Sequence, residues 1–319
     1  IFSRDASQRV AKKDGRRDHN IEFGTNPCSE IILRPYEYCN LTEVVIREND
    51  NEESLKNKIR IATILGTYQA TLTNFPYIRS IWAKNTSEES LLGVSLTGIM
   101  DNPLTANPDP DFLTRLRQHA IQVNNVYATN FNINIAAAIT CVKPSGTVSQ
   151  LVDSASGIHA RHSRYYIRRV RGDNKDPLTQ FMIQSGVPAE PDVMKPHSTS
   201  VFSFPIKAPE TGVLRDSMNA IDQLEIWLKY ARYWCEHKPS VTISVKEEEW
   251  PDVGAWVWKH FDEISGVSFL PHDGGTYKQA PYEECTKDQY EELLAKMPVS
   301  IDWDSLNEDD DNVEGAQML

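Results

Sequence analysis

An apolar run in the middle of the chain, INIAAAITCVKP at residues 133–144, constrains the fold more than any other feature. It ends in a turn that contains Pro and Gly, and such a run suits a strand buried on both faces, as in a parallel sheet. Segments with helical spacing lead into other short β-branched runs further along the chain. This alternation of helix and strand predicts an α/β protein, either a barrel or a doubly wound sheet.

The periodicity also predicts individual elements. Residues 4–14 are predicted to form a polar helix, and the sequence predicts five further helices at residues 52–75, 110–128, 217–236, 249–264 and 286–296. Pro76 should end the second of these helices. A short apolar run at residues 31–33 precedes a turn at Arg34–Pro35, and short strands are expected in the second half of 36–46, at 240–245 and at 266–270. No repeat or low-complexity linker interrupts residues 1–300, which we therefore expect to form one portion.

Composition and charge exclude several classes of protein. The 319 residues are 40% hydrophobic, yet no apolar run approaches the ~20 residues that span a bilayer. The formal net charge is -12, and residues 301–319, which contain no Lys or Arg, are predicted to be an acidic linker. An acidic surface argues against duplex nucleic acid as a ligand. We therefore expect a protein that binds neither nucleic acid nor membrane.

The start of the chain and its cysteines point to a cellular location. The opening IFSRDASQRV has no Met and no apolar signal segment, and five cysteines are an odd number for a disulfide framework. We expect reduced thiols in a cytoplasmic protein, and a chain that is a piece of a longer one.

The segment GTNPCSEIILRPYEYCNLTEV is the richest in reactive groups. Asn26, Cys28 and Glu30 alternate, so in an extended loop an amide, a thiol and a carboxylate could face one substrate, and Cys39 follows eleven positions after Cys28. A carboxylate next to a thiol raises the thiol's pKa, which argues against a nucleophilic thiolate. The pattern favours a sulfur that donates a hydrogen atom or carries a radical, while Glu30 moves protons.

Six segments in order resemble one enzyme family. They are NPCSE with CNL, GVSLTGIMDN, CVKPSGTVSQL, SGIHARHSRYYIRRVR, CEHKPSVTISV, and GVSFLP with YKQAPYEE. Together they are similar to the class II, adenosylcobalamin-dependent ribonucleoside-triphosphate reductases. The resemblance implies the second half of a ten-stranded α/β barrel, with helix–strand repeats over 55–300 and a finger loop at about 24–42.

The resemblance also implies roles for single residues. Cys28 would become the thiyl radical that abstracts the substrate's 3′-hydrogen, Glu30 would be the general base on the 3′-hydroxyl, and Asn26 would hold the sugar. Cys39 would be one member of the pair that supplies reducing equivalents and ends as a disulfide. Cys141, Cys235 and Cys285 lack reactive neighbours and are expected to be bystanders.

A second candidate site follows the apolar run. The turn PSGTVS would open a helix, where backbone N–H groups and hydroxyls suit an anion, although an ordinary turn is also compatible with these residues. In the family the matching loop cradles the substrate's phosphates. The predicted substrate-binding residues are Pro144, Ser145, Gly146, Thr147 and Ser149.

The basic segment HARHSRYYIRRVRG, residues 159–172, has several interpretations. Arginines interleaved with Tyr165 and Tyr166 suggest single-stranded nucleic acid, but structural ion pairs are the simpler expectation, with one or two arginines near a triphosphate or cofactor. His159 and His162 have a metal-ligand spacing but lack further ligands, so we predict no metal site.

The family resemblance further implies partners. It predicts adenosylcobalamin as radical source, although no residue here is assigned to the corrin, a thioredoxin-type dithiol as reductant, and a dNTP effector bound outside this chain. It also implies a missing N-terminal half, without which the chain should not turn over. Three alternatives remain: a class I large-subunit fragment with a separate radical-generating subunit, a non-catalytic interaction module, and a Cys-His hydrolase. The region DQYEELLAKMPVSIDW lacks the adjacent tyrosines of class I.

Overall fold

The computed structural model describes residues 4–272 and 277–306. Its internal contacts divide these residues into two compact units: unit 1 holds residues 4–161 and 209–272, and unit 2 holds residues 162–208 and 277–306. The acidic linker expected at 301–319 lies outside the described residues from position 307 onward. The single portion expected over 1–300 stays a prediction.

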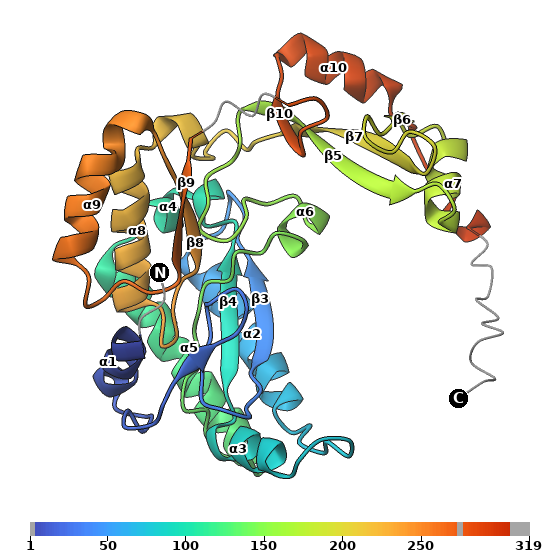
Figure 1. The fold of residues 1–319 in the computed structure, drawn as a ribbon. Helices are drawn as coiled ribbons and strands as arrows, with labels where there is room; N and C mark the ends of the chain where they lie inside the picture. The colour runs from blue at the N-terminus through green and yellow to red at the C-terminus, as the bar shows by residue number, and fades with distance from the viewer. Residues whose placement is uncertain (1–3, 273–276, 307–319) are drawn as a thin grey trace. The chain divides into compact units, whose positions relative to one another are not determined.

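Parallel strands form the centre of unit 1 (Figure 1). β3 (Asn40–Val45) pairs with β4 (Leu92–Thr97), and β8 (Val241–Val245) pairs with β9 (Val267–Pro271). Residues 138–142 run parallel between the two pairs, with bridges from Thr140 to β4 and from Val142 to Pro239 ahead of β8. The parallel order is therefore β3, β4, residues 138–142, β8 and β9, which confirms an α/β fold.

The apolar run is buried from Ala138 to Val142, whereas Ile135 ahead of this stretch is exposed, and the run makes single bridges in place of a continuous ladder. Leu92 N–H donates to the Ala138 carbonyl and Val94 N–H to the next carbonyl, that of Ile139. Two residues of β4 thus match one residue of the run, and this slip interrupts the ladder in the manner of a bulge. Ala138, Ile139 and Val142 are still buried in the core.

Helices pack against these strands, and most lie where periodicity predicts them. The helices of unit 1 are α1 (Arg4–Asp14), α2 (Glu52–Gln69), α3 (Ile81–Glu89), α4 (Pro103–Ala106), α5 (Pro110–Asn130), α6 (Val148–Leu151), α8 (Ala220–Tyr233) and α9 (Trp250–Lys259). α2 begins at an Asn51 capping box but ends before Pro76. At its end the Thr71 hydroxyl donates to the Tyr68 carbonyl, and such local bonding competes with helix continuation.

Unit 2 is built differently, around an antiparallel sheet. Its strands are ordered β10 (Tyr282–Glu284), β5 (Tyr165–Asp173), β7 (Thr199–Lys207) and β6 (Ala189–Pro191), and its helices are α7 (Pro177–Gln184) and α10 (Lys287–Lys296). β5 and β7 pair over nine residues, from Tyr165 opposite Lys207 to Asp173 opposite Thr199. This sheet departs from the helix–strand alternation that the sequence suggested.

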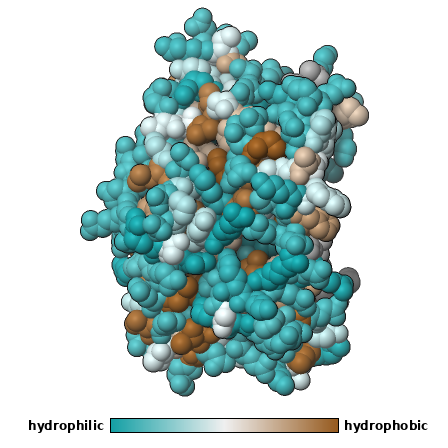
Figure 2. All heavy atoms as spheres, turned by 90° about the vertical axis from the view of Figure 1, so that its left-hand side faces the viewer, coloured by the Kyte–Doolittle hydropathy of each residue, from teal (hydrophilic) through white to brown (hydrophobic). Residues whose placement is uncertain are grey.

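The surface agrees with the composition. Figure 2 shows a face on which hydrophilic residues surround scattered hydrophobic ones, as is usual for a protein surface. Among the helices of the described residues, none combines the length and apolarity needed to cross a bilayer.

Candidate active site

Cys28 lies at the tip of a short β-hairpin. β1 (Gly24–Thr25) and β2 (Ile32–Leu33) pair in antiparallel fashion and leave residues 26–31 as the connection. Ser29 N–H donates to the Asn26 carbonyl at 3.0 Å, and Ile31 N–H donates to Asn26 Oδ1 at 3.1 Å. Asn26 therefore shapes a tight turn that leaves Cys28 exposed.

Glu30 has the opposite environment. Its residue exposure is 0%, and within the described part of the chain neither carboxylate oxygen has a hydrogen-bond partner. The structure thus differs from the expected alternation of positions 26, 28 and 30, because the chain turns at Asn26–Ser29 before it reaches Glu30. The hairpin exposes a thiol at its tip and buries a carboxylate at its root, two residues before β2 begins.

The residues that hold the hairpin root come from the segment before β8. Ile32 N–H donates to His237 Nδ1 at 3.2 Å, and His237 Nε2 bonds the Leu92 carbonyl at 2.9 Å, so the ring joins the hairpin to β4. Burial, with a contribution from the charge of Arg17, lowers the pKa of His237 to about 3, which keeps the ring neutral. Lys238 N–H donates to the Glu30 carbonyl at 3.0 Å.

Arg17 ties the same root to two buried carboxylates. Its guanidinium donates to the Ile32 carbonyl at 2.7 Å, to Glu89 Oε1 at 2.9 Å and to Glu37 Oε2 at 3.2 Å. Burial, followed by the hydrogen bond with Glu89, raises the pKa of Glu37. The hairpin is therefore seated in a buried charged network, which the sequence analysis did not predict. The sequence holds one signal for buried polar contacts here: three consecutive titratable residues, Glu236, His237 and Lys238, lie shortly before the strand predicted at 240–245.

Cys39 lies directly before β3 and is half-buried. Burial raises the pKa of its thiol well above the usual range, so the sulfur stays protonated at neutral pH. A Cβ added at Gly93 would lie 3.4 Å from Cys39 Sγ and 2.9 Å from Ile31 Cδ1, and it would also meet Leu41. The glycine of the GVSLTG motif is therefore needed for the close approach of Cys39 and the hairpin to β4.

The loop at residues 144–149 is held mainly by its own hydroxyl groups. Ser149 Oγ donates to the Ser145 carbonyl and lies 2.8 Å from Ser156 Oγ, while Ser145 Oγ donates to Glu43 at 2.8 Å. Both serines are buried, whereas Gly146 and Thr147 are exposed. An incoming anion would meet the backbone of Gly146 and Thr147, because the serine hydroxyls shape the loop from within.

The basic segment forms mainly structural contacts. Arg161 is buried and pairs with Asp101 at 2.8 Å, and Arg171 pairs with Asp192 at 2.7 Å. Arg168 lies over the ring of Tyr282, against which His162 also stacks. His159 Nε2 accepts from Thr242 N–H at 3.0 Å. Across residues 4–272 and 277–306, no three His, Cys, Asp or Glu side chains are grouped to hold a metal ion.

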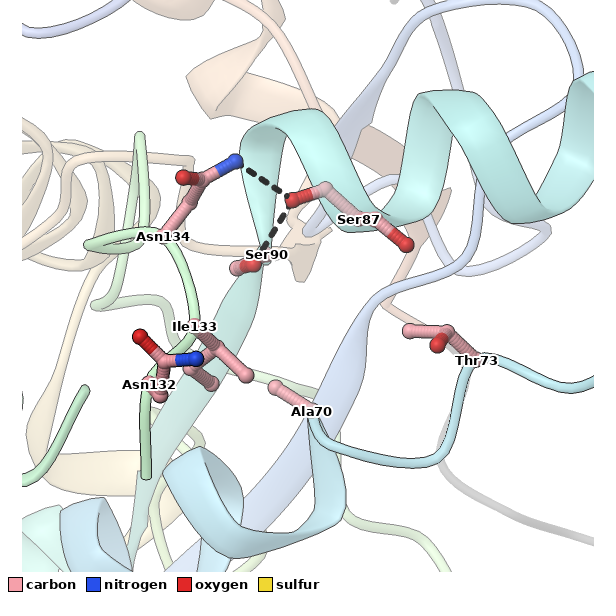
Figure 3. A pocket seen from close by; sticks show the side chains of 7 residues that line it. All are labelled: Ala70, Thr73, Ser87, Ser90, Asn132, Ile133 and Asn134. Carbon is pink, nitrogen blue, oxygen red and sulfur yellow. Dashed lines mark hydrogen bonds between the residues drawn. The ribbon is translucent and has the colours of Figure 1, made fainter. Parts of the chain in front are cut away.

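An open hollow of about 300 Å³ lies elsewhere in unit 1, between the ends of α2 and α3 and residues 132–134. Figure 3 shows that Asn134 and Ser90 point toward the same carbonyl, that of Ser87, at 2.9 and 3.1 Å. The residues that line it are Ala70, Thr73, Ser87, Ser90, Asn132, Ile133 and Asn134. None of the predicted site residues is among them.

Comparisons with known proteins give a consistent result. No protein-family model matches the chain. An adenosylcobalamin-dependent ribonucleoside-triphosphate reductase of Lactobacillus gasseri is 30% identical, over 95% of this chain and 45% of the relative. The enzyme of that name from Euglena gracilis is 28% identical, over 98% of this chain and 43% of the relative. The chain thus spans less than half the length of these relatives.

Two solved structures of ribonucleotide reductases also resemble this chain. A B12-dependent, class II ribonucleotide reductase aligns with a TM-score of 0.77 and 26% identity, over 89% of this chain and 43% of that protein. The class Id ribonucleotide reductase alpha subunit of Actinobacillus ureae aligns with a TM-score of 0.51 and 12% identity, over 84% of this chain and 57% of that protein. The second likeness is one of fold alone.

Proposed function

We propose that this chain, which is similar over nearly its whole length to part of the adenosylcobalamin-dependent ribonucleoside-triphosphate reductases, carries the radical and proton-transfer groups of such an enzyme. The proposed reaction reduces ribonucleoside triphosphates to 2′-deoxyribonucleoside triphosphates. The observation that carries the proposal is the hairpin, with an exposed thiol at Cys28 and a fully buried carboxylate at Glu30.

The chemistry of the hairpin residues supports this assignment. A thiyl radical at Cys28 would take the 3′-hydrogen of the sugar, and the Glu30 carboxylate would accept the proton of the 3′-hydroxyl as the 2′-hydroxyl leaves as water. Two thiols would then supply two electrons and two protons and end as a disulfide. Asn26 would hold the sugar through its amide while its Oδ1 keeps the turn closed.

Cys39 suits the role of a reducing thiol. Its raised pKa keeps it protonated, so it can donate a hydrogen atom, whereas a thiolate would be the form required of a nucleophile. Its partner in the disulfide would come from a part of the enzyme that this chain does not contain.

The exposed thiol of Cys28 also fits an external radical source. When bound, adenosylcobalamin supplies the radical chemistry that protein side chains cannot generate alone. Cys28 is the residue of this chain that would receive the radical.

The loop at residues 144–149 would hold the substrate's phosphates. Gly146 and Thr147 present exposed backbone to an anion, and Pro144, Ser145 and Ser149 set the shape of the loop. The five parallel segments of unit 1 would then be half of a ten-stranded barrel, and the hairpin would be its finger loop.

The remainder of the enzyme would complete the site. We expect it to bring the second half of the barrel, the second redox cysteine and a site for a dNTP effector, with a thioredoxin-type dithiol as reductant in the cytoplasm. His237, the histidine that bonds the hairpin, uses both ring nitrogens for backbone groups, which argues against its acting as the base of a Cys-His hydrolase.

A reconstitution assay tests the proposal. The purified chain, adenosylcobalamin, a ribonucleoside triphosphate and a dithiol should form no deoxynucleotide until a polypeptide that covers the remainder of a relative is added. In the assembled enzyme Cys28→Ser should abolish the product and the thiyl signal in electron paramagnetic resonance, while Cys285→Ser should retain both. Full activity of Cys28→Ser would overturn the assigned chemistry, and activity that needs a metal-containing subunit would favour the class I alternative.

A further inference from the structure

The carboxylate of Glu43 contacts one candidate part of the site and interacts electrostatically with the other. Glu43 lies on β3, the strand that directly follows Cys39. Its Oε2 accepts a hydrogen bond from Ser145 Oγ, in the 144–149 loop, at 2.8 Å. The charge of Glu30, at the root of the hairpin, also acts on the Glu43 carboxylate. Glu43 itself has no part in the proposed radical chemistry.

A second contact joins the start of the same loop to the neighbouring strand. Ser95 on β4 lies directly opposite Glu43 in the parallel register, and its hydroxyl is 3.5 Å from Glu43 Oε1. The Ser95 oxygen accepts from the Lys143 N–H, directly ahead of the loop, at 2.9 Å. Glu43 and Ser95 thus hold the start of the loop to β3 and β4.

The start of the loop also packs closely against a further segment. A Cβ added at Gly157 would collide with the Lys143 carbonyl oxygen. Ser145 is buried and has a φ of 54°, a left-handed conformation that residues other than glycine keep only where the surrounding structure fixes it. The hold on Ser145 therefore directs the chain into the exposed residues Gly146 and Thr147.

A carboxylate is unexpected beside a place for phosphates, because like charges repel. Burial raises the pKa of Glu43, whereas the hydrogen bond from Ser145 and the charge of Lys143 lower it. The contacts of Glu43 explain its presence: it offers an acceptor to the loop hydroxyl. Bonds within the loop set its shape, and the bonds to Glu43 and Ser95 set where it lies.

We propose that Glu43 is a positioning residue for the substrate's phosphates, whose carboxylate anchors the 144–149 loop to β3 through Ser145 and so places the Gly146 and Thr147 backbone to receive an anion. The inference rests on the proposed function, in which this loop holds the phosphates. Glu43 acts through Ser145 and does not touch the substrate. Its effect is therefore expected on nucleotide binding and not on the radical step.

The affinity of the full chain for inorganic tripolyphosphate, measured by titration calorimetry at fixed ionic strength, tests the anchor. Glu43→Ala should weaken binding about fivefold, the factor of an ordinary hydrogen bond, although it removes a negative charge. Glu43→Gln should bind at least as tightly as the wild type, because its amide can accept from Ser145 and donate to Ser95 without the repulsion. Glu53→Ala, at an exposed acid of α2, is the control and should keep the wild-type affinity.

The sign of the change separates anchoring from simple repulsion. Repulsion alone predicts that Glu43→Ala binds tripolyphosphate more tightly than the wild type. Equal or tighter binding by folded Glu43→Ala would therefore overturn the proposal.

Ser145→Ala keeps the test open if Glu43→Ala does not fold. It removes the donor of the same hydrogen bond and should weaken tripolyphosphate binding by a similar factor. The double variant Glu43→Ala/Ser145→Ala should bind no more weakly than either single variant, because both remove one bond. Additive losses, or wild-type affinity in Ser145→Ala, would contradict the anchor.

Steady-state kinetics of the assembled enzyme distinguish binding from chemistry. Glu43→Ala should raise the KM for the ribonucleoside triphosphate about fivefold and change kcat less, and Glu43→Gln should restore the KM. A lower kcat at unchanged KM would overturn the positioning role.

The two proposals can fail separately. If the wild-type chain does not bind tripolyphosphate, the proposed phosphate role of the loop is wrong. If the wild type binds it and Glu43→Ala binds it equally well, only the role of Glu43 is wrong. Full activity in Cys28→Ser would overturn the radical chemistry and leave the tripolyphosphate affinities unaffected.

Discussion

The hairpin at residues 24–33 and the loop at residues 144–149 are both candidate parts of one site, yet they are held in different ways. The hairpin root is held by side chains from outside the hairpin, chiefly Arg17, 15 residues from Ile32, and His237, 205 residues from Ile32. The loop is held by the bond between Ser149 and Ser145 within itself, with Ser156 nearby in sequence and Glu43 as partners outside it. The position of the thiol therefore depends on tertiary structure, whereas the shape of the loop is largely local.

Arg17→Met should produce the largest effect and tests the first half of this comparison. The variant removes the donor to the buried carboxylates of Glu37 and Glu89 and to the Ile32 carbonyl. Removing one partner of a buried ionic network costs about 3–5 kcal/mol of unfolding free energy. Urea denaturation followed by circular dichroism measures the loss.

Arg115→Met is the matched control for Arg17→Met. Arg115 pairs with Glu52 at 2.8 Å, but it is exposed, so its removal should change stability little. If Arg17→Met and Arg115→Met lose the same unfolding free energy, the buried network of Arg17 does not stabilise the protein more than the exposed Arg115–Glu52 pair does.

His237→Leu should have the next largest effect and should also change the pH dependence. The variant leaves the Ile32 N–H and the Leu92 carbonyl without their hydrogen-bond partner. Each unsatisfied buried group costs about 1–3 kcal/mol of unfolding free energy. The folded pKa of about 3 lies below the ordinary value of 6.5, so the neutral ring stabilises the fold above about pH 6.5 and this contribution is lost toward pH 3.

Stability curves between pH 3 and pH 7 check this expectation. The wild type should lose more stability over that window than His237→Leu does, because the variant has no ring to protonate. His197→Leu, at an exposed position of unit 2, should retain the wild-type slope. Parallel curves for wild type and His237→Leu would argue against the buried neutral ring.

Gly93→Ala and Gly146→Ala compare the two regions by the same substitution. A Cβ at position 93 would meet Leu41, Ile31 and Cys39, whereas a Cβ at position 146 has nothing within 4 Å. Overpacking of this kind costs about 1–3 kcal/mol of unfolding free energy. Gly93→Ala should therefore unfold at a lower urea concentration than the wild type, and Gly146→Ala should unfold at nearly the wild-type concentration. A reversed order would contradict the close approach of the hairpin to β4.

Ser149→Ala should have the smallest effect, and a local one. The variant removes the hydrogen bonds to the Ser145 carbonyl and to Ser156. Their loss should lower the unfolding free energy by about 1 kcal/mol. Hydrogen exchange should become faster at residues 144–152 and stay unchanged at residues 24–33. Faster exchange in the hairpin as well would mean that the two regions are coupled.

The sequence predicted the elements whose signals are local. The polar helix α1 was placed at its observed bounds and α5 to within two residues, because polar composition in α1, and apolar spacing with an Asp-Pro cap in α5, are carried by the segments themselves. The ladder of the run at 133–144 was less well predicted, since its register slip depends on β4, which is distant in sequence; the end of α2 was misplaced although the bond of Thr71 to the Tyr68 carbonyl is local. The antiparallel sheet of unit 2 was missed because β5 and β7 are separated by α7 and by a third strand.

The sequence alone determined which chemistry this chain can carry: the NPCSE segment holds an amide, a thiol and a carboxylate within five residues, and that content does not depend on the fold. Only the tertiary structure decided where each group lies, with Cys28 in solvent, Glu30 fully buried and Lys238 beside it. The physical reason is that burial is set by contacts between segments far apart in the sequence, such as His237 and Ile32, which no local pattern records.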